Sequence, residues 1–467
     1  MKILFIHNFD YYEPLGIMHI SSLLKYKGYQ CELYDIKFES KHYKTIKKIN
    51  PNIIAYSVTT NNWKRYCDFN NALKKEFKFL SVFGGPHATF FPELIYEDGI
   101  DVICRGEGEY PMLDLVNKIN FNLAGYNIPN LWFKTASGII KNNVRPLISN
   151  LDSLPFPDRE LINKYKLYRK RTRIRTITSR GCPYDCSYCF NHAYRDLYKK
   201  SSHKVRRRSP ENVIKEILTL TNIYNPKSLE FHDDIFILNK KWLSEFVTLY
   251  KNTKLNIPFE VNVRADLVTE EIAKLLQEAG CYSAQFGIES GNLHIRKDIL
   301  NREITNEQIL HSARLLKKYK IKINTFNIIG IPEETLENAI ETIKLNSLAK
   351  PTYAMNSIYQ PYPGTSLAEF AKKNNFYFGD VASFDRNYLY GKSVIISPDI
   401  KRLERLHYLF AFGVKYPKLI IIIKLLTKIP ANKIFQSMYF LYRVFYVIFV
   451  FKRLSVKEVF LRIRAKT

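Results

Sequence analysis

The chain has little cysteine and few acidic side chains for its length. Its 467 residues include seven cysteines, too few for a disulfide scaffold, which favours a reducing compartment. The first residues, MKILFIHNFDYYEP, hold an apolar run too short for a secretory signal, with no small-residue cleavage site after it. This run is expected to be a buried strand. These absences predict a cytoplasmic protein, and a hydrophobic content of 46% predicts sizeable cores.

The shortage of acidic residues leaves a formal net charge of +27, concentrated towards the carboxyl end. Residues 401–467 contain fifteen Lys and Arg against two Glu, an excess of thirteen positive charges. The same segment contains an apolar and aromatic run, Ile434 to Phe451, that Gln436 and Arg443 interrupt. A membrane-spanning helix needs about 20 nearly uncharged residues. The run therefore fits an interfacial amphipathic helix better, with basic ends facing anionic headgroups.

Three interpretations of this basic segment stay open. It is a peripheral membrane contact or the binding region for a lipid-like substrate, a packed helical subdomain, or a nucleic-acid surface. Nucleic acid is the least favoured, because the aromatic side chains cluster in apolar runs. A second basic stretch, YKKSSHKVRRRSPENV at residues 198–213, is interpreted as a solvated connector. Its alternative is a contact of one of Arg206–Arg208 with substrate or cofactor.

Apolar strand patterns alternate with helical patterns along two parts of the chain. Residues 1–120 predict a doubly wound parallel sheet, whose ligand lies beyond the carboxyl ends of the strands, where SVTT and GGPH fall. Residues 121–160 lose this rhythm and predict a small hairpin and a proline-punctuated linker. A second series, from Arg173 to about residue 370, has six strand patterns. It predicts an open or partial barrel with its active site at the strand ends.

Three of the cysteines are gathered in one short loop, RGCPYDCSYCFN. Cys182, Cys186 and Cys189 have the spacing C-x3-C-x2-C and follow the predicted strand IRTITSR. A cubane iron–sulfur cluster takes four ligands, so three thiols with no fourth nearby leave one iron open. Structural zinc needs a closed set of four, usually two C-x2-C pairs, and the sequence has no second pair. The other cysteines stand alone and are expected to be small buried hydrophobes: Cys31, Cys67, Cys104 and Cys281.

The loop resembles the cluster loop of the radical S-adenosylmethionine (SAM) superfamily, in which C-x3-C-x2-C binds a [4Fe–4S] cluster. The resemblance implies that the open iron chelates SAM and that one electron cleaves SAM to a 5′-deoxyadenosyl radical. An electron donor such as flavodoxin or ferredoxin is then required. The segments LEFHDDIF, VNVRADL, FGIESG and NIIGIPEET resemble further motifs of the family, in the same order. They imply SAM-binding roles for Tyr188, Asp233, Asp234, Arg264, Glu289 and Gly330.

The N-terminal part resembles the cobalamin-binding, flavodoxin-like domain that precedes the barrel in one branch of this superfamily. The matching segments are AYSVTT, FGGPHATFFPE, VICRGEGEYP and LDSLPFPDREL. The resemblance implies cobalamin contacts from Ser57, Gly84, Gly85 and His87, the glycines letting the backbone approach a bulky group. The D-x-H-x-x-G motif that supplies a cobalt-ligating histidine is absent. A domain that has lost the cofactor is therefore the alternative.

These features predict an α/β chain in four parts. They are a flavodoxin-like cobalamin-binding domain (1–125), a hairpin and linker (126–170), a partial (β/α)6 radical SAM barrel (171–375) and a helical basic region (376–467). The leading hypothesis is a cobalamin-dependent radical SAM enzyme that methylates an unactivated carbon of a small-molecule or lipid-like substrate. It works in the cytoplasm, free or at the inner membrane face.

Two alternatives to methylation stay open. The first is a radical SAM oxidative cyclase or rearrangement enzyme, with or without cobalamin. The second is a membrane-associated module that keeps a structural metal site without catalysis. No cysteine follows Cys281, which argues against auxiliary clusters and against methylthio transfer. The sequence names neither the substrate nor a catalytic residue beyond the groups that would hold the cofactors.

Overall fold

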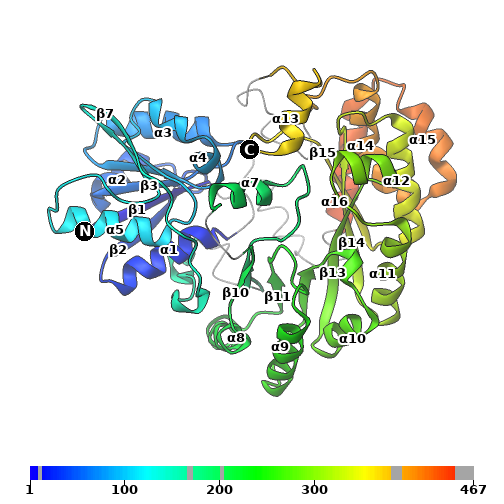
Figure 1. Cartoon of the computed structure of the whole chain (residues 1–467), viewed down its shortest axis with the longest axis horizontal. Helices are drawn as coiled ribbons and strands as arrows, with labels where there is room; N and C mark the ends of the chain where they lie inside the picture. The colour runs from blue at the N-terminus through cyan, green and yellow to red at the C-terminus, as the bar shows by residue number, and fades with distance from the viewer. Residues whose placement is uncertain (9–12, 166–171, 200–203, 380–391, 447–467) are drawn as a thin grey trace. The chain divides into compact units, whose positions relative to one another are not determined.

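The structure, a computed structural model, describes residues 1–8, 13–165, 172–199, 204–379 and 392–446. These residues form two compact units (Figure 1). The N-terminal unit consists of Met1–Thr172, Ala193–Arg208 and Thr219–Asn225, and the barrel unit of Arg173–His192, Ser209–Leu218 and Pro226–Thr467. The predicted domain edge after residue 170, and residues 447–451 of the predicted apolar run, lie outside the described residues. The domain edges after residues 125 and 375 stay predictions.

The N-terminal unit is built on a seven-stranded sheet in the order β2-β1-β3-β4-β5-β6-β7. Strands β1 to β5 are parallel, and β6 and β7 form an antiparallel hairpin at one edge. The order of the parallel strands is that of flavodoxin-like sheets, so the predicted doubly wound fold is confirmed. The strands are β1 Lys2–His7, β2 Gln30–Asp35, β3 Ile53–Ser57, β4 Leu80–Gly84, β5 Val102–Cys104, β6 Leu131–Thr135 and β7 Gly138–Lys141.

Helices lie on both faces of this sheet, with α1 and α5 packed together on one of them (Figure 1). The sequence pattern predicts α1, α3 and α5 but not α2, whose eight residues are mostly polar. The helices are α1 Leu15–Tyr26, α2 His42–Ile49, α3 Trp63–Lys74, α4 Pro86–Phe90 and α5 Glu109–Asn120, with short 3-10 turns at η1 Pro92–Tyr96, η2 Leu151–Ser153 and η3 Arg159–Ile162.

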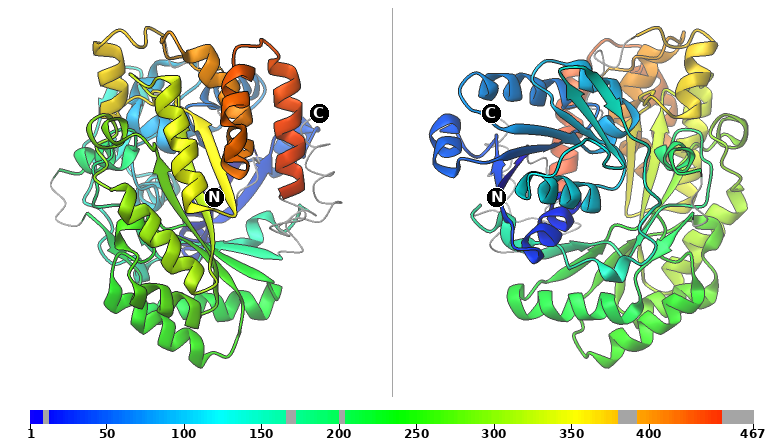
Figure 2. Two further views of the ribbon diagram at one scale, coloured as in Figure 1. Left: turned by 90° about the vertical axis from the view of Figure 1, so that its right-hand side faces the viewer. Right: turned by 60° about the vertical axis from the view of Figure 1, so that its left-hand side comes forward.

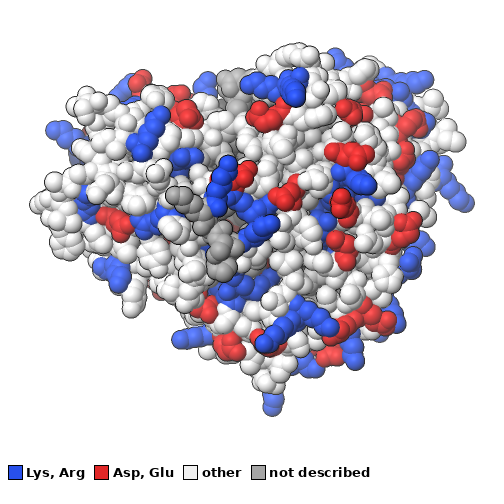
Figure 3. Space-filling model, in the orientation of Figure 1, with Lys and Arg blue, Asp and Glu red and all other residues white. Residues whose placement is uncertain are grey.

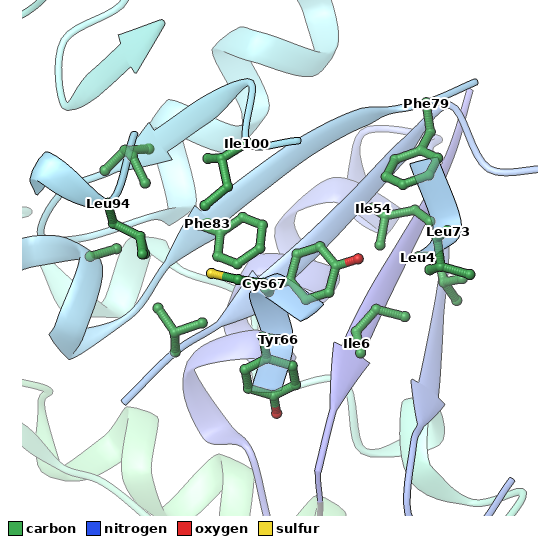
Figure 4. Packing of buried hydrophobic residues seen from close by; sticks show 14 of the residues in the cluster. Leu4, Ile6, Ile54, Tyr66, Cys67, Leu73, Phe79, Phe83, Leu94 and Ile100 are labelled. Carbon is green, nitrogen blue, oxygen red and sulfur yellow. The ribbon is translucent and has the colours of Figure 1, made fainter. Parts of the chain in front are cut away.

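The core of the N-terminal unit is aromatic and aliphatic, and it takes in one of the isolated cysteines (Figure 4). Tyr56 of β3 stacks on Phe83 of β4, with ring centroids 4.4 Å apart, and Cys67 of α3 lies among them. Burial raises the pKa of the Cys67 thiol to about 12, so it is a neutral apolar group. The expectation of burial is confirmed for all four isolated cysteines: Cys31, Cys67, Cys104 and Cys281.

The basic stretch after the cysteine loop is not a solvated connector, and that interpretation is wrong for two of its arginines. Arg206 and Arg208 are each 6% exposed. Nη1 of Arg206 donates to both carboxylate oxygens of Glu107, at 2.8 and 3.0 Å, and to the carbonyl of Ile148 at 2.8 Å. The guanidinium of Arg208 lies over the ring of Phe156. Both side chains therefore hold the N-terminal unit together; residues 200–203 of the stretch lie outside the described residues.

The barrel unit contains an open sheet of six parallel strands in the order β15-β14-β13-β12-β11-β8. This confirms the predicted six-unit partial barrel. The strands are β8 Arg173–Thr176, β11 Ser228–Phe231, β12 Phe259–Asn262, β13 Cys281–Glu289, β14 Lys322–Ile329 and β15 Tyr353–Ile358. Two-residue strands, β9 Ser179–Arg180 and β10 Arg206–Arg207, lie outside this sheet.

Threonine N-caps start three of the crossover helices of the barrel unit. The hydroxyls of Thr269, Thr305 and Thr335 each accept a hydrogen bond from the backbone of the first turn that follows. Such caps fix where each crossover helix begins, and thereby where the preceding strand must end. Two helices along this part of the chain belong partly to each unit, α7 Phe190–Leu197 and α8 Pro210–Tyr224. The others belong to the barrel unit: α9 Lys240–Asn252, α10 Glu270–Glu278, α11 Asn306–Lys318 and α12 Leu336–Ala349, with η4 Ala265–Leu267 and the π-turn η5 Ile295–Ile299.

The carboxyl-terminal helices pack on the outside of the barrel sheet. Leu403, Leu406 and Phe410 of α14 join a cluster with Ile340 and Ile343 of α12. No helix within the described ranges is both long and apolar enough to cross a membrane. The elements are α13 Ser366–Lys373, α14 Ile400–Lys415, η7 Pro417–Leu419, α15 Ile420–Leu426 and α16 Asn432–Phe445.

The ion pair of Glu107 and Arg206 generates a stability prediction. Replacement of Arg206 by Met leaves the Glu107 carboxylate buried without its cation, which is expected to cost about 3–5 kcal/mol of the free energy of unfolding. Chemical denaturation followed by circular dichroism measures this loss. The control is Lys204→Met, which removes the same charge from an exposed position two residues away and leaves stability nearly unchanged. Equal stability of the two variants would contradict the assignment.

Candidate functional site

The three clustered cysteines lie in the loop between β8 and α7, at the carboxyl end of the barrel sheet's edge strand. Cys186 is buried, and Cys182 and Cys189 are partly exposed. The loop turns tightly, because the amide of Cys189 donates to the carbonyl of Cys186 at 3.0 Å. Ser187 ties the loop to the segment after β13, through its amide to Leu300 and its hydroxyl to Ile299. The loop is therefore held by a hydrogen bond within it and by the bonds of Ser187 to the segment after β13.

Asp233, at the end of β11, supports the approach to this loop. It is fully buried, and its carboxylate accepts hydrogen bonds from the amide of Thr178 at 3.1 Å, the hydroxyl of Thr178 at 2.6 Å and the hydroxyl of Ser179. These bonds fix the segment between β8 and the cysteines. The predicted contact of Asp233 with SAM stays a prediction, and the bonds seen here give this carboxylate a positioning role.

Asp234 turns the other way and lies by the thiols. It is exposed, and its negative charge raises the pKa of both Cys182 and Cys189, although burial is the larger cause for each thiol. The side chain of Asn191 hydrogen-bonds Asp234 and also donates to Sγ of Cys189 at 3.5 Å. A carboxylate and an amide thus stand at the open side of the loop, where an amino or hydroxyl group of a ligand would find acceptors.

Two buried arginines converge on Cys186. Nη1 of Arg302 lies 3.8 Å and Nη1 of Arg264 lies 4.0 Å from its Sγ. Arg264 is fixed by Asp266 and by stacking over the ring of Tyr184, with its guanidinium carbon 3.6 Å from the ring centroid. A guanidinium beside a sulfur offsets the negative charge that this sulfur carries when it binds a metal. The predicted residue Arg264 therefore lies at the cysteine loop in this structure.

Glu289 reaches the loop from the end of β13. Its carboxylate accepts a hydrogen bond from the hydroxyl of Tyr188 at 3.0 Å, and Arg302 lies 3.4 Å from the same hydroxyl. Burial raises the pKa of Glu289, and the charge of Arg302 opposes this rise. A Cβ at Gly287 would lie 1.8 Å from Oε1 of Glu289, so only glycine admits this carboxylate. Tyr188, Glu289, Arg302 and Cys186 therefore form one network.

Gly330 ends β14 in a turn of positive φ, 78°. Its amide donates to Oε2 of Glu334 at 2.6 Å, and burial raises the pKa of this carboxyl group to about 8. A Cβ at Gly330 would meet Ile400 and Ser393, at 3.3 and 3.6 Å. The structure thus gives Gly330 a turn role, and its predicted contact with SAM stays a prediction.

The four residues predicted to contact cobalamin lie together in the N-terminal unit, at the carboxyl ends of β3 and β4. Ser57 and Gly84 are register partners, and Gly85 follows with a φ of 91°. A Cβ at Gly85 would lie 2.8 Å from the backbone nitrogen and oxygen of Val58, so the close approach of these two strand ends requires glycine. The site borders the switch point of the sheet, where flavodoxin-like folds bind ligands.

His87 is held in an aromatic stack at the same edge. Its ring lies 5.3 Å from that of Trp63 at an interplanar angle of 12°, and 4.8 Å from that of Phe91 at 25°. Burial lowers the pKa of the imidazole to about 4, so the ring is neutral near pH 7. The backbone amide of His87 donates to Val58, which joins α4 to the end of β3. Whether this edge binds cobalamin through these four residues stays a prediction.

Sequence reasoning missed Arg302 and Asn191. Asn191 stands in the cysteine stretch, two residues after the last thiol, and its closeness was a usable signal. Arg302 is 116 residues from Cys186 in a polar turn, ILNREIT, with no periodic pattern. Only the fold of β13 and the turn after it brings this arginine to the loop.

The donor set fits a [4Fe–4S] cluster. Three soft thiols share one loop, and guanidinium and amide donors lie beside two of the sulfurs. Across the part of the chain that the structure describes, no group of three or more His, Cys, Asp or Glu side chains is arranged to hold a single metal ion. In a cubane each thiolate binds a different iron, so the three sulfurs need not meet at one point.

Two family models match the chain. The B12 binding domain matches residues 1–116, which contain all the parallel strands of the N-terminal unit. The Radical SAM superfamily matches residues 176–345, a range that begins at the last residue of β8 and contains the three clustered cysteines. The two matches follow each other along the chain in the order predicted from the sequence.

Known relatives extend over most of the chain. The uncharacterized methyltransferase PH0819 of Pyrococcus horikoshii is 32% identical over 371 residues, which cover 78% of this chain and 79% of that protein. The anaerobic magnesium-protoporphyrin IX monomethyl ester cyclase of Cereibacter sphaeroides is 26% identical over 395 residues, 79% of this chain and 63% of the cyclase. The structure of the radical SAM methyltransferase TsrM from Kitasatospora setae, with cobalamin and a [4Fe–4S] cluster bound, shares the fold: its TM-score is 0.65 at 17% identity, covering 80% of this chain and 75% of that one.

The arginines at Cys186 generate a redox prediction. Replacement of Arg302 by Met removes a positive charge next to a cluster thiolate, which makes electron uptake less favourable. The reduction potential of the reconstituted cluster is expected to fall by about 60 mV, a tenfold change in a one-electron equilibrium. A titration followed by electron paramagnetic resonance (EPR) measures it. The control Arg314→Met removes an exposed arginine of α11; equal potentials in the two variants would contradict the prediction.

The buried imidazole generates a pH prediction. His87 has a folded-state pKa of about 4 against 6.5 for the free side chain, so the unfolded chain binds a proton first as the pH falls. The N-terminal unit is therefore expected to lose about 3 kcal/mol of stability between pH 6.5 and 4 through this group. His87→Phe keeps the aromatic stack and should flatten this part of the pH profile in chemical denaturation. A variant with the wild-type slope would exclude His87 as its source.

The matched domains, their order and the 32% identity over most of the length of PH0819 agree with the geometry of the two sites. The barrel unit presents three thiols at its strand ends, and the N-terminal unit presents a glycine-lined edge at its switch point. This chain belongs to the radical SAM superfamily, as a member with a B12-binding domain ahead of its radical SAM domain.

Proposed function

We propose that this radical SAM enzyme is a cobalamin-dependent methyltransferase that acts on an unactivated carbon of a small-molecule or lipid-like substrate. One observation carries the proposal: a B12-binding domain precedes a three-thiol loop whose fourth cysteine is missing from the sequence around it. The similarity to PH0819, which is named a methyltransferase, supports the choice of reaction. When bound, the cluster, SAM and cobalamin supply one-electron cleavage of SAM, hydrogen-atom abstraction and a methyl group.

The residues of the barrel unit divide the work of holding these groups. Cys182, Cys186 and Cys189 bind the cluster, and Arg302 and Arg264 stabilise its most buried thiolate. The bonds of Asp233 to Thr178 and Ser179 keep the loop at the strand end, so the thiols are placed before the cluster binds.

Other residues of the barrel unit are proposed to contact SAM. Asp234 faces the thiols from the end of β11, where its carboxylate would accept from the amino group of SAM. Tyr188 donates a hydrogen bond to Glu289 next to Cys186. At this strand end the carboxylate of Glu289 would accept a hydrogen bond from a ribose hydroxyl of SAM. Gly330 is proposed on the adenine side.

In the N-terminal unit, Ser57, Gly84, Gly85 and His87 are proposed to line the cobalamin site. Their shared place at the ends of β3 and β4 supports this proposal, because flavodoxin-like sheets bind ligands at that edge. His87 is neutral and stacked between two aromatic rings, so it is proposed as a packing contact and not as a charged one.

A radical cyclase is the second candidate. The similarity to the anaerobic magnesium-protoporphyrin IX monomethyl ester cyclase, over 79% of this chain, favours it. Such an enzyme would use the same thiols and the same SAM contacts but would return no methyl group to its product. The reactions therefore differ in the fate of the SAM methyl group and not in the cluster site.

The partners and the location follow as proposals. We propose a low-potential electron donor such as flavodoxin or ferredoxin, which reduction of the cluster would require, and a cytoplasmic location. Attachment to the inner face of the membrane is proposed for the basic carboxyl-terminal helices. Nucleic acid is not among the proposed partners.

The radical chemistry is tested at Cys186. The reconstituted, reduced Cys186→Ala variant is expected to lose formation of 5′-deoxyadenosine from SAM, since the cluster needs all three local thiolates. Cys281→Ala is the matched control, because Cys281 is a buried cysteine inside β13, away from the loop, and should retain cleavage. Unchanged SAM cleavage in Cys186→Ala would overturn the assignment of the cluster site.

The choice between methylation and cyclisation is tested with methyl-labelled SAM. The protein reconstituted with cobalamin is incubated with a metabolite and lipid extract of its source organism, and label is sought in products other than SAM. The expected result is transfer of label to a product, and only by protein that has retained cobalamin, as its corrinoid absorbance shows. Formation of 5′-deoxyadenosine with no label in any product would favour the cyclase.

A further inference from the structure

The carboxyl-terminal helices carry apolar side chains on the face that points away from the barrel. On α16 four large apolar residues spaced four, three and four apart form one stripe, and they are exposed by 63, 42, 67 and 50%: Ile434, Met438, Leu441 and Phe445. Three residues of α15, which packs on α14 as α16 does, are exposed as well, by 74, 52 and 57%: Ile421, Ile422 and Leu425. We name these seven side chains the outer face.

The outer face is not the side that anchors these helices. Phe435 and Tyr439 of α16 are buried and pack with α14, and Ile423 of α15 is buried in the same cluster. The ring of Tyr442 lies 4.8 Å from that of Phe412 of α14. Figure 2 (left) shows the orange and red helices α14, α15 and α16 side by side on the outside of the barrel unit. Each helix therefore has one apolar side packed on the fold and a second one facing solvent.

A single-chain protein seldom exposes so many neighbouring apolar side chains without a function for them. The exposed stripe of α16 runs along the whole helix, so it is not the frayed end of an element. Elsewhere in the barrel unit, Leu293 and Leu348 are examples of exposed apolar residues that stand singly. The outer face is therefore a binding surface for an apolar partner.

The charge around the outer face selects the partner. No Asp or Glu occurs between Glu404 and Glu458, and this interval holds seven described basic residues: Arg405, Lys415, Lys418, Lys424, Lys428, Lys433 and Arg443. Of these, Lys424 pairs with Glu337 of α12. In Figure 3, Lys and Arg side chains stand along the right-hand edge, where Figure 1 places α15. The surface is apolar, and α15, α16 and the turns beside them contribute only basic charged side chains to its border.

This positive charge disfavours two possible partners of the outer face, a second copy of the chain and the chain's own residues 447–467. A second copy would bring the same cationic surface against the first, and like charges repel across an interface. Residues 447–467 of the chain hold six Lys and Arg against one Glu, so their charge has the same sign as well. An apolar partner with negative charge on its surface remains, and a bilayer that contains anionic lipid has both properties.

We infer that the outer face of α15 and α16 binds an anionic membrane surface, with its apolar side chains in the interface and its lysines on the headgroups. This inference rests on the membrane attachment proposed above and names its residues, and it is independent of the methyl-transfer proposal. It specifies the residues by which an enzyme of this kind would reach a substrate that resides in a bilayer.

Vesicle co-sedimentation of the full chain, without added cofactors, tests the inference. Binding to vesicles of phosphatidylcholine with phosphatidylglycerol is expected to exceed binding to pure phosphatidylcholine by about tenfold, and to weaken as salt is raised. The triple variant Ile421→Gln, Leu425→Gln, Leu441→Gln is expected to lose at least about tenfold in affinity. Wild-type binding that is absent, or equal for both lipid compositions, would overturn the inference.

A matched control removes similarly exposed apolar side chains elsewhere: Ile223→Gln, Leu293→Gln and Leu348→Gln. It should bind vesicles as the wild type does, and an equal loss in both triple variants would overturn the assignment of the face. Thermal unfolding of the outer-face variant verifies that it folds. Analytical ultracentrifugation without lipid detects a dimer; a dimer that this variant abolishes would assign the face to a second copy instead. Retained 5′-deoxyadenosine formation in the outer-face variant separates this result from the radical chemistry.

Discussion

The placement of negative charge at the end of the barrel sheet is the constraint on which the site depends. Three thiols share a loop of eight residues, of which Cys186 is buried. A buried sulfur that carries negative charge needs positive charge or hydrogen-bond donors beside it. The chain meets this need with Arg264 and Arg302 at the sulfur of Cys186 and with Asn191 at that of Cys189. These contacts explain why residues far apart in the sequence lie together at the carboxyl end of the barrel sheet.

The same constraint accounts for the acids nearby. The carboxylate of Asp233 accepts hydrogen bonds from the segment before the loop, so hydroxyl and amide donors stabilise its charge. Glu289 faces Tyr188 and Arg302, and Gly287 leaves the space that its carboxylate fills. Asp234 is an exposed residue beside the thiols, and its carboxylate is hydrogen-bonded by Asn191. Asp233 is therefore structural and Glu289 is paired, and Asp234 is the acid proposed to accept from the amino group of SAM.

Much of this could be predicted from the sequence, because the signals were local. The three thiols stand within eight residues, and strand and helix patterns alternate regularly, so both sheets and the loop's place after β8 were predictable. The isolated cysteines were expected to be buried, and they are. Arg302 was not predictable, since its partner lies 116 residues away and no periodic pattern marks it. Arg206 was wrongly expected in solvent, because a run of three arginines does not show that one of them forms a buried ion pair with Glu107.

The most direct test of the account is EPR of the reduced, reconstituted protein with SAM labelled by nitrogen-15 at its amino group. A cluster held by Cys182, Cys186 and Cys189 alone has one iron free to bind SAM. The account predicts a [4Fe–4S] signal that changes when SAM is added and a hyperfine coupling to the labelled nitrogen. A cluster signal that SAM leaves unchanged, with no such coupling, would contradict it.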